Sequence, residues 1–320
     1  MSFSGRVKEE LSYQTGVAMH CRIAEIAAIL SLCGKVNIDE NGKVSVKIHT
    51  ENLAVSRKYF TLVKKTYNID CDIAIRSHIH TGKSRSYILD VKDDYAARKI
   101  LSSVKFMNGD GNFERDYTQV DSLILRKACC KRAFLRGAFL CAGSISEPEK
   151  TYHFEIVCTT PERAWQICDM MKTFDIEGKY ITRKKYHVVY IKEASQIVDI
   201  LNVMEAHVSL MELENIRILK EMRNSVNRKV NCETANINKT VSAAVKQVED
   251  ITYLRDMIGF ENMPDNLVEA AYARLDHPDA TLKELGESLT PPVGKSGINH
   301  RLRKLSEMAE SLRQKQGGLL

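Results

Sequence analysis

The sequence has no long apolar run, and its start is polar. A membrane-spanning helix needs roughly 20 consecutive apolar residues. A secretory signal needs an apolar core behind a basic start. Residues Met1–Glu10 offer no such core. These absences argue against a membrane protein and a secreted one, so we expect a cytoplasmic protein with no membrane partner.

Motifs for common cofactors are lacking as well. The chain has neither a phosphate loop nor a dinucleotide fingerprint. Gly82-Lys83-Ser84 matches only the end of a phosphate-loop motif. The nine cysteines include no C-x-x-C pair, and no cysteine pair lies near His78 and His80. We therefore predict free thiols, no metal site and no cofactor.

Length and composition are those of an ordinary globular protein. With 320 residues, 44% hydrophobic and 28% charged, the chain can form two or three domains with real cores. The net charge of +6 is compatible with a polyanionic partner but does not require one. The charge is concentrated locally, because Lys295–Lys304 contains four basic residues and no acid.

Two nine-residue segments, Ile26–Gly34 and Leu135–Gly143, share a pattern of apolar and small residues that ends in glycine. Each predicts a helix that stops at its glycine. The two terminal glycines are 109 residues apart, and so are Thr50 and Thr159. Similar helix and strand patterns follow each segment, which indicates an internal duplication. Chance similarity of two α/β segments is the alternative.

The periodicities predict a domain over residues 1–204 with repeats at about 20–105 and 121–204. In the first repeat we expect helices at 20–33, 52–66 and 93–104 and strands at 44–49, 69–76 and 86–91. In the second we expect helices at 121–142, 161–174 and 193–203 and strands at 152–158, 178–183 and 186–191.

Beyond residue 204 the patterns are helical. Residues 205–230 predict a helical linker, the polar stretch Asn231–Thr240 interrupts the periodicity, and residues 231–320 predict a compact helical domain. We expect helices at about 240–257 and 265–275, and Thr281 with Glu284 forms a capping box for a short helix over 281–288. After a turn, Ser296 is placed to cap a longer helix with Ile298, Leu302, Leu305 and Met308 inward. Helix, turn and basic helix is the helix-turn-helix arrangement.

The second helix of this pair carries the candidate DNA-binding residues. A recognition helix presents hydrogen-bond donors to phosphates and base edges from its N-terminal half, and its first backbone amides can hold a phosphate. A helical hairpin with a solvated basic face is the alternative, and the turn is longer than usual. We favour DNA binding through Lys295, Ser296, Asn299, His300, Arg301, Arg303 and Lys304.

The segment LRGAFLCAG resembles the LAGLIDADG motif of homing endonucleases. The resemblance implies an α+β fold: a duplicated domain with a pseudo-twofold axis, two central helices and mixed or antiparallel saddle sheets, here followed by an all-α helix-turn-helix domain. Small residues let the central helices approach closely, and Ala28 and Gly137 occupy matched positions. In the family each helix ends in an acid that binds the catalytic metal. Those acids fall at Cys33 and Ala142, which cannot replace them as magnesium ligands. The resemblance therefore implies the scaffold and argues against the nuclease.

In that fold the outward residues of the strands face the duplex. The outward candidates are Ser45, Lys47, His49, Arg76, Arg183, Lys184, Lys185 and His187. However, Asp72 and Glu155 are on comparable strands, where a carboxylate repels phosphate. A secondary DNA contact, a protein contact and a ligand-sensing role all remain open for this domain.

Taken together, the chain resembles the WhiA family of bacterial transcription regulators. The features that carry the resemblance are Ser2-Phe3-Ser4, Val7–Leu11, the two degenerate helices, Asn231–Thr240 and Leu282–Leu305. The resemblance implies a helix-turn-helix similar to sigma-factor region four. It also implies a role in sporulation or in cell division and chromosome segregation.

The combined hypothesis is a non-enzymatic, sequence-specific, nucleoid-associated transcription regulator. Its main partner is the double-stranded DNA of promoter regions, and another transcription factor or RNA polymerase is a further candidate partner. The alternatives are an active LAGLIDADG endonuclease and a ligand-sensing or protein-recruiting adaptor.

Overall fold

The computed structural model describes residues 1–77, 85–107 and 118–317. The chain forms two compact units, Met1–Lys220 (the larger unit) and Glu221–Leu320 (the C-terminal unit). His78, His80 and the Gly82–Ser84 motif lie outside the described residues. Within the described ranges, no helix is long and apolar enough to cross a membrane.

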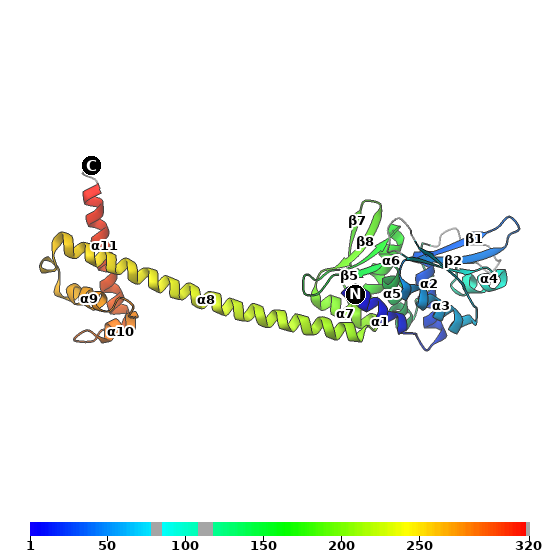
Figure 1. Cartoon of the computed structure of the whole chain (residues 1–320), viewed down its shortest axis with the longest axis horizontal. Helices are drawn as coiled ribbons and strands as arrows, with labels where there is room; N and C mark the ends of the chain where they lie inside the picture. Colours follow the sequence, from blue (N-terminus) through cyan, green and yellow to red (C-terminus); the bar gives the residue numbers. More distant parts are fainter. Residues whose placement is uncertain (78–84, 108–117, 318–320) are drawn as a thin grey trace. The chain divides into compact units, whose positions relative to one another are not determined.

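The larger unit contains two four-stranded sheets with the same strand order (Figure 1). The first has the order β1-β2-β4-β3 and the second β5-β6-β8-β7, and all neighbouring strands are antiparallel. The first sheet's strands are Gly34–Ile38 (β1), Val44–Thr50 (β2), Asp72–Ser77 (β3) and Arg85–Val91 (β4). The second sheet's are Gly143–Ile145 (β5), Phe154–Cys158 (β6), Lys179–Arg183 (β7) and Tyr186–Ile191 (β8). The matching orders support the predicted duplication.

Two of these strands, β1 and β5, were not predicted from the sequence. Each begins at the glycine that ends a central helix. A Cβ on Gly34 would lie 2.4 Å from the carbonyl oxygen of Leu30, and one on Gly143 would lie 2.6 Å from that of Phe139. Glycine is needed here because the chain passes directly from helix to strand across the helix's own last turn.

Helices cover one face of each sheet, and two of them lie between the sheets (Figure 1). The central pair is Met19–Cys33 (α2) and Ala128–Ala142 (α5), so the helix expected at 121–142 begins later. The others are Phe3–Tyr13 (α1), Leu53–Tyr67 (α3), Asp94–Ser103 (α4), Pro161–Lys172 (α6) and Ala194–Met204 (α7). The apolar faces predicted for these segments form one continuous core.

The central helices pack with their backbones in close contact. A Cβ on Gly137 of α5 would lie 2.9 Å from the carbonyl oxygen of Glu25 and 3.0 Å from Cβ of Ala28, both on α2. The matched pair Ala28 and Gly137 is therefore the contact point itself. Even a methyl group at residue 137 would push the helices apart.

A buried ion network surrounds this contact. Glu25, Lys58 and Arg136 are all almost completely buried. A carboxylate oxygen of Glu25 lies 2.9 Å from Nζ of Lys58 and 3.0 Å from Nε of Arg136. Arg136 also contacts Glu205 at 2.6 Å, and Lys58 donates to the carbonyl oxygens of Leu11 and Gln14. Burial lowers the pKa of Lys58, and the Glu25 carboxylate opposes that shift. The network joins α1, α2, α3 and α5 to the end of α7.

The longest helix, His207–Ile258 (α8), is continuous over 52 residues. The interruption expected at Asn231–Thr240 is wrong, because that stretch is helical and exposed. Its polar side chains stay in solvent or bond the helix itself, as when the Thr240 hydroxyl donates to the carbonyl of Asn236 at 2.9 Å. Residues 207–258 contain no glycine or proline, and Gly259 with φ of 74° follows the helix end. The boundary between the units, at Lys220 and Glu221, falls inside the linker proposed for 205–230.

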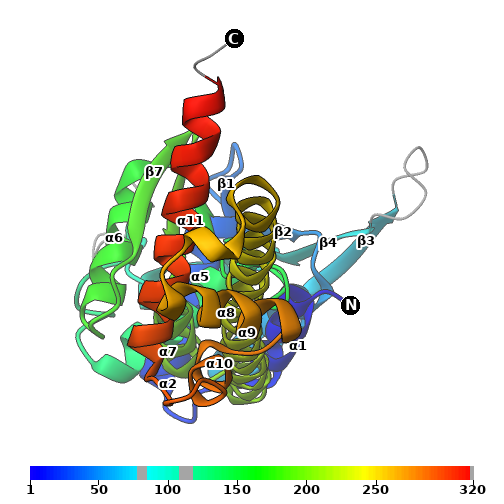
Figure 2. The same ribbon diagram turned by 90° about the vertical axis from the view of Figure 1, so that its left-hand side faces the viewer.

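The C-terminal unit is all helical (Figure 2). After α8 come a 3₁₀ turn, Phe260–Asn262, and three helices, Asp265–Asp276 (α9), Leu282–Glu287 (α10) and Lys295–Gly317 (α11). Its core joins all four helices and includes Ile251, Leu254, Leu267, Leu285, Ile298 and Leu302. Arg313 of α11 lies 2.6 Å from the buried Asp250 carboxylate of α8, which fixes α11 against that helix.

Replacing Glu25 by glutamine should lower the free energy of unfolding of the larger unit by about 3–5 kcal/mol, because two buried cations lose their counter-charge. Asp70→Asn is the matched control, since it removes the exposed partner of Lys64 and should cost less than about 1 kcal/mol. Urea unfolding followed by fluorescence of Trp165, the single tryptophan, measures both. Equal effects of the two variants would show that the network does not hold this unit together.

Candidate nucleic-acid interface

The first helix of the predicted helix-turn-helix, α10, begins with the expected capping box. The backbone N–H of Thr281 donates to the Glu284 carboxylate at 2.7 Å, and that of Glu284 donates to the Thr281 hydroxyl at 3.4 Å. The backbone hydrogen bond from Thr281 lowers the pKa of Glu284. The box fixes where α10 begins.

The turn between α10 and α11 depends on a close backbone approach at Gly286. The N–H of Val293 donates to the carbonyl oxygen of Gly286 at 2.9 Å. A Cβ on Gly286 would lie only 2.3 Å from the carbonyl oxygen of Val293. On the other side of α10, the buried Arg274 donates to the carbonyl oxygens of Pro278 and Ala280 at 3.1 and 2.8 Å. These bonds hold the backbone before and after α10 without help from side chains of α11.

The second helix, α11, begins at Lys295, one residue earlier than Ser296 as a cap would require. Ser296 is therefore in the first turn, and the carbonyl of Gly294 accepts the N–H of Ile298. Ile298, Leu302 and Leu305 are buried and Met308 is half-buried, as predicted. At 3.6 residues per turn, the opposite side of the helix carries one continuous exposed arc. This exposed arc comprises Lys295, Ser296, Asn299, His300, Arg303 and Lys304.

One predicted member, Arg301, does not belong to the exposed arc. Its side chain is only 21% exposed and turns toward α9. It donates to the carbonyl oxygen of Asn266 at 3.2 Å and to the Glu269 carboxylate at 3.3 Å. Arg301 is next to the apolar stripe, so packing on α9 determines its direction. Arg303 also has an acidic partner, Glu307, at 3.0 Å, but both side chains are well exposed and can exchange that partner for a phosphate.

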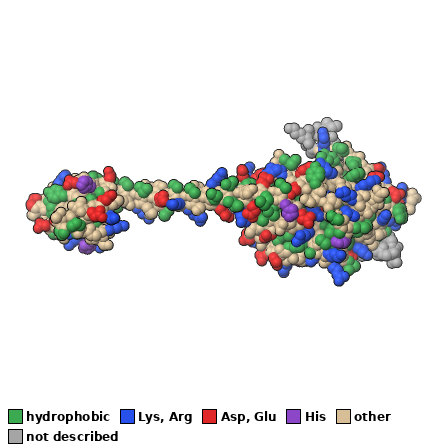
Figure 3. Space-filling view, turned by 90° about the horizontal axis from the view of Figure 1, so that it is seen from below, with side chains coloured by type: hydrophobic (Ala, Val, Ile, Leu, Met, Phe, Trp, Pro, Cys, Tyr) green, Lys and Arg blue, Asp and Glu red, His purple; other side chains and the backbone are tan. Residues whose placement is uncertain are grey.

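The outward faces of the two sheets carry charges of both signs. Lys47 lies 3.2 Å from Asp90, and Arg183 lies 3.7 Å from Glu155. The other outward basic candidates His49, Arg76, Lys184 and Lys185 are exposed. His187 was predicted to point outward, but it pairs with the buried Cys158 in the register and so lies on the helix-facing side. Acidic and basic side chains are also interspersed over the part of the larger unit visible in Figure 3.

The degenerate acid positions lie at the C-terminal ends of α2 and α5. Cys33 ends α2, and a hydrogen bond from Cys141 lowers the pKa of its thiol, with Lys8 contributing. Burial lowers the pKa of Lys8 itself, while Cys141 and Cys33 oppose that shift. The Lys8 ammonium lies 5.8 Å above the ring of Phe139. A cationic side chain is thus already present beside the two helix ends, and neither Cys33 nor Ala142 supplies a carboxylate.

The sequence analysis did not bring together four side chains at the opposite ends of these helices. His20, Cys21, Cys129 and Cys130 come within 4.8 Å of one another. The duplication gives the signal that finds them, because His20 and Cys21 are each 109 residues before Cys129 and Cys130.

Fold and site define a class: a duplicated LAGLIDADG-like domain without the catalytic acids, joined to a helix-turn-helix. Three family models match the chain: "WhiA N-terminal LAGLIDADG-like domain" over residues 19–107, "WhiA LAGLIDADG-like domain" over 131–223 and "WhiA C-terminal HTH domain" over 226–309. The chain belongs to the WhiA family.

Curated relatives match it along nearly its whole length. A probable cell division protein WhiA of Lachnoclostridium phytofermentans is 53% identical, covering 98% of this chain and 100% of the relative. That of Alkaliphilus metalliredigens is 44% identical, covering 98% and 99%. The crystal structure of full-length WhiA from Thermatoga maritima has the same fold, with a TM-score of 0.58 and 23% identity, covering 97% of this chain and 99% of that one.

Two glycine substitutions test the turn. Gly286→Ala should destabilise the C-terminal unit by roughly 1–3 kcal/mol, because the new methyl group collides with the Val293 carbonyl. Gly297→Ala is the control, since its Cβ would meet Val293 at an ordinary 3.5 Å and alanine favours the helix. Hydrogen exchange of peptides from residues 221–317 reports the local stability. Faster exchange in Gly297→Ala than in Gly286→Ala would contradict this account of the turn.

Proposed function

We propose that this protein is a sequence-specific DNA-binding transcription regulator without nuclease activity. The observation that carries the proposal is the exposed arc of α11. Its residues belong to the N-terminal half of the second helix of a helix-turn-helix, which is the part that enters the major groove in this class of motif. The buried side of the same helix is anchored on α8, α9 and α10, so the arc is presented by a rigid support.

The residue types in the arc divide into two roles. Lys295, Arg303 and Lys304 supply charge to the phosphate backbone, which gives affinity but no sequence information. Asn299, Ser296 and His300 supply directional hydrogen bonds that can distinguish base edges, and an asparagine amide matches the adenine edge best. The first backbone amides of α11 offer a further phosphate contact.

The genes under control are proposed from the relatives. Those relatives are described as probable cell division proteins. We therefore place the regulated genes in cell division, together with the chromosome segregation or sporulation that accompanies it. A promoter-bound regulator of this kind acts in the cytoplasm at the nucleoid.

The larger unit is proposed as a retained scaffold. Asp90 and Glu155 pair with the basic residues on its sheet faces, so those faces attract phosphate less than α11 does. Mixed charge suits a protein surface, so another transcription factor or RNA polymerase is the partner proposed there. A secondary DNA contact through Lys47, His49, Arg76, Arg183, Lys184 and Lys185 is the competing assignment.

The double variant Arg303→Ala/Lys304→Ala should weaken binding to DNA fragments recovered by chromatin immunoprecipitation. If each side chain contacts one phosphate, the slope of log K against log salt should become shallower by about 2. Arg255→Ala, on the last turn of α8 in the same unit, should leave the slope unchanged. Fluorescence anisotropy across a salt series measures both. An unchanged slope in the double variant would remove α11 from the interface.

The rival nuclease assignment predicts cleavage, whereas ours predicts none. Purified protein incubated with supercoiled plasmid and Mg²⁺ should leave the plasmid intact, because Cys33 and Ala142 stand where metal-binding carboxylates are needed. The Cys33→Asp/Ala142→Asp variant serves as a comparison for any trace contaminant. Mg²⁺-dependent nicking by the wild-type chain that persists through several purification steps would refute the non-catalytic assignment.

A further inference from the structure

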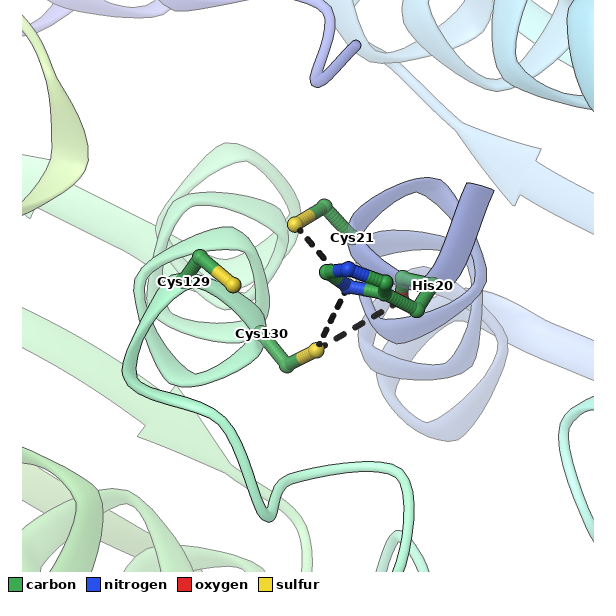
Figure 4. Close-up of side chains that lie close together, drawn as sticks. All are labelled: His20, Cys21, Cys129 and Cys130. Atoms are coloured by element: carbon green, nitrogen blue, oxygen red, sulfur yellow. Dashed lines mark hydrogen bonds between the residues drawn. The ribbon is translucent and has the colours of Figure 1, made fainter. Parts of the chain in front are cut away.

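Four metal-binding side chains converge at the N-terminal ends of the central helices (Figure 4). His20 and Cys21 are the second and third residues of α2, and Cys129 and Cys130 are the second and third residues of α5. Nδ1 of His20 lies 3.2 Å from Sγ of Cys130 and 3.3 Å from Sγ of Cys21. All four ligand atoms lie within 4.8 Å of one another.

The duplication explains why these residues meet. The pseudo-twofold relation of the repeats superimposes the first turn of α2 on that of α5, so equivalent positions face each other across the helix contact. The close packing at Gly137 brings the two first turns together. Two ligands from each helix therefore surround the approximate symmetry axis, although 109 residues separate His20 from Cys129.

The dimensions match a tetrahedral metal site. With Zn–S of about 2.3 Å and Zn–N of about 2.0 Å, tetrahedral ligand atoms are roughly 3.6–3.8 Å apart. The observed separations span that value, and side-chain rotations of about 1 Å would equalise them. Cys21 and Cys130 are buried at 8% and 2% exposure, whereas His20 and Cys129 reach solvent and give an ion its path of entry.

From this geometry we infer that His20, Cys21, Cys129 and Cys130 form a structural zinc site. Three thiolates and one imidazole are the soft and borderline ligands that Zn²⁺ prefers over Mg²⁺ or Ca²⁺. Four protein ligands fill the tetrahedral shell, so the site is structural and leaves no position for substrate.

The surrounding charges support the bound state. Binding Zn²⁺ replaces three thiol protons, which leave to solvent, so the site goes from neutral to a net charge of −1. Both α2 and α5 direct the positive ends of their dipoles at this charge. The basic residues Arg126 and Lys127 line a cleft shared with His20 and Cys130.

The ion joins the two repeats at the end of the helix pair opposite Cys33 and Ala142. The helix contact relies on small residues and a buried ion network, which do not by themselves prevent the first turns from fraying. Zinc would cross-link those turns through side chains. The site thus stabilises the pairing of repeats, and it is independent of whether α11 binds DNA.

Metal analysis of the full chain, purified without chelator, tests the inference. The wild-type protein should contain about one zinc per chain, and Cys130→Ser less than about a tenth. Cys232→Ser is the matched control, because Cys232 is an exposed cysteine of α8, and it should retain the metal. Cobalt substitution gives a second readout, in which the thiolate-to-cobalt band reports the number of sulfur ligands.

The variant His20→Cys protects the test against misfolding. It should still bind one metal ion, and its thiolate-to-cobalt band should rise by about one third as three sulfurs become four. Wild-type protein without zinc and without the cobalt band would overturn the inference. A disulfide among Cys21, Cys129 and Cys130 in protein purified without oxygen would overturn it as well, as would equal zinc loss in Cys232→Ser.

Discussion

The close contact of α2 and α5 is the constraint on which the rest of the larger unit depends. With glycine at residue 137, the helix backbones approach until only Ala28 fits between them. That approach buries Glu25, and a buried carboxylate is tolerated only with opposite charge beside it. Lys58 and Arg136 supply that charge from α3 and α5. Because Lys58 also bonds the end of α1 and Arg136 bonds Glu205, a single packing contact determines where four further segments are attached.

The two ends of this helix pair now have different chemistry. In a homing endonuclease the C-terminal ends carry the metal-binding acids, but here Cys33, Cys141 and Lys8 occupy that region. The buried ammonium of Lys8 occupies a place where a catalytic cation would need negative partners. At the N-terminal ends, His20 and three cysteines form a set that is suited to zinc. Metal chemistry has thus moved from a catalytic to a structural end of the same scaffold, in the proposal made above.

In the C-terminal unit, packing selects which polar residues of α11 remain available. The apolar stripe of Ile298, Leu302 and Leu305 fixes the rotation of the helix, and rotation determines exposure. Arg301 is next to that stripe and is held by Glu269, so it supports the fold. Arg303 and Lys304, two and three residues further on, point away from it. A difference of two residues along the helix therefore separates a structural arginine from a candidate DNA contact.

The sequence alone determined the duplication, the helix-turn-helix with its capping box, the buried faces and the missing acids, because these depend on local periodicity and on residues at known spacings. Tertiary structure decided the rest. Periodicity states which face is buried but not what covers it, so the partners of Glu25 and Arg301 could not be predicted. The side of the sheet on which His187 lies follows from strand register, and a shift of one residue reverses it. The polar Asn231–Thr240 stretch remained helical because it contains no helix breaker, although its apolar pattern stops. The convergence of His20 with Cys130 depends on helix packing that no short spacing rule describes.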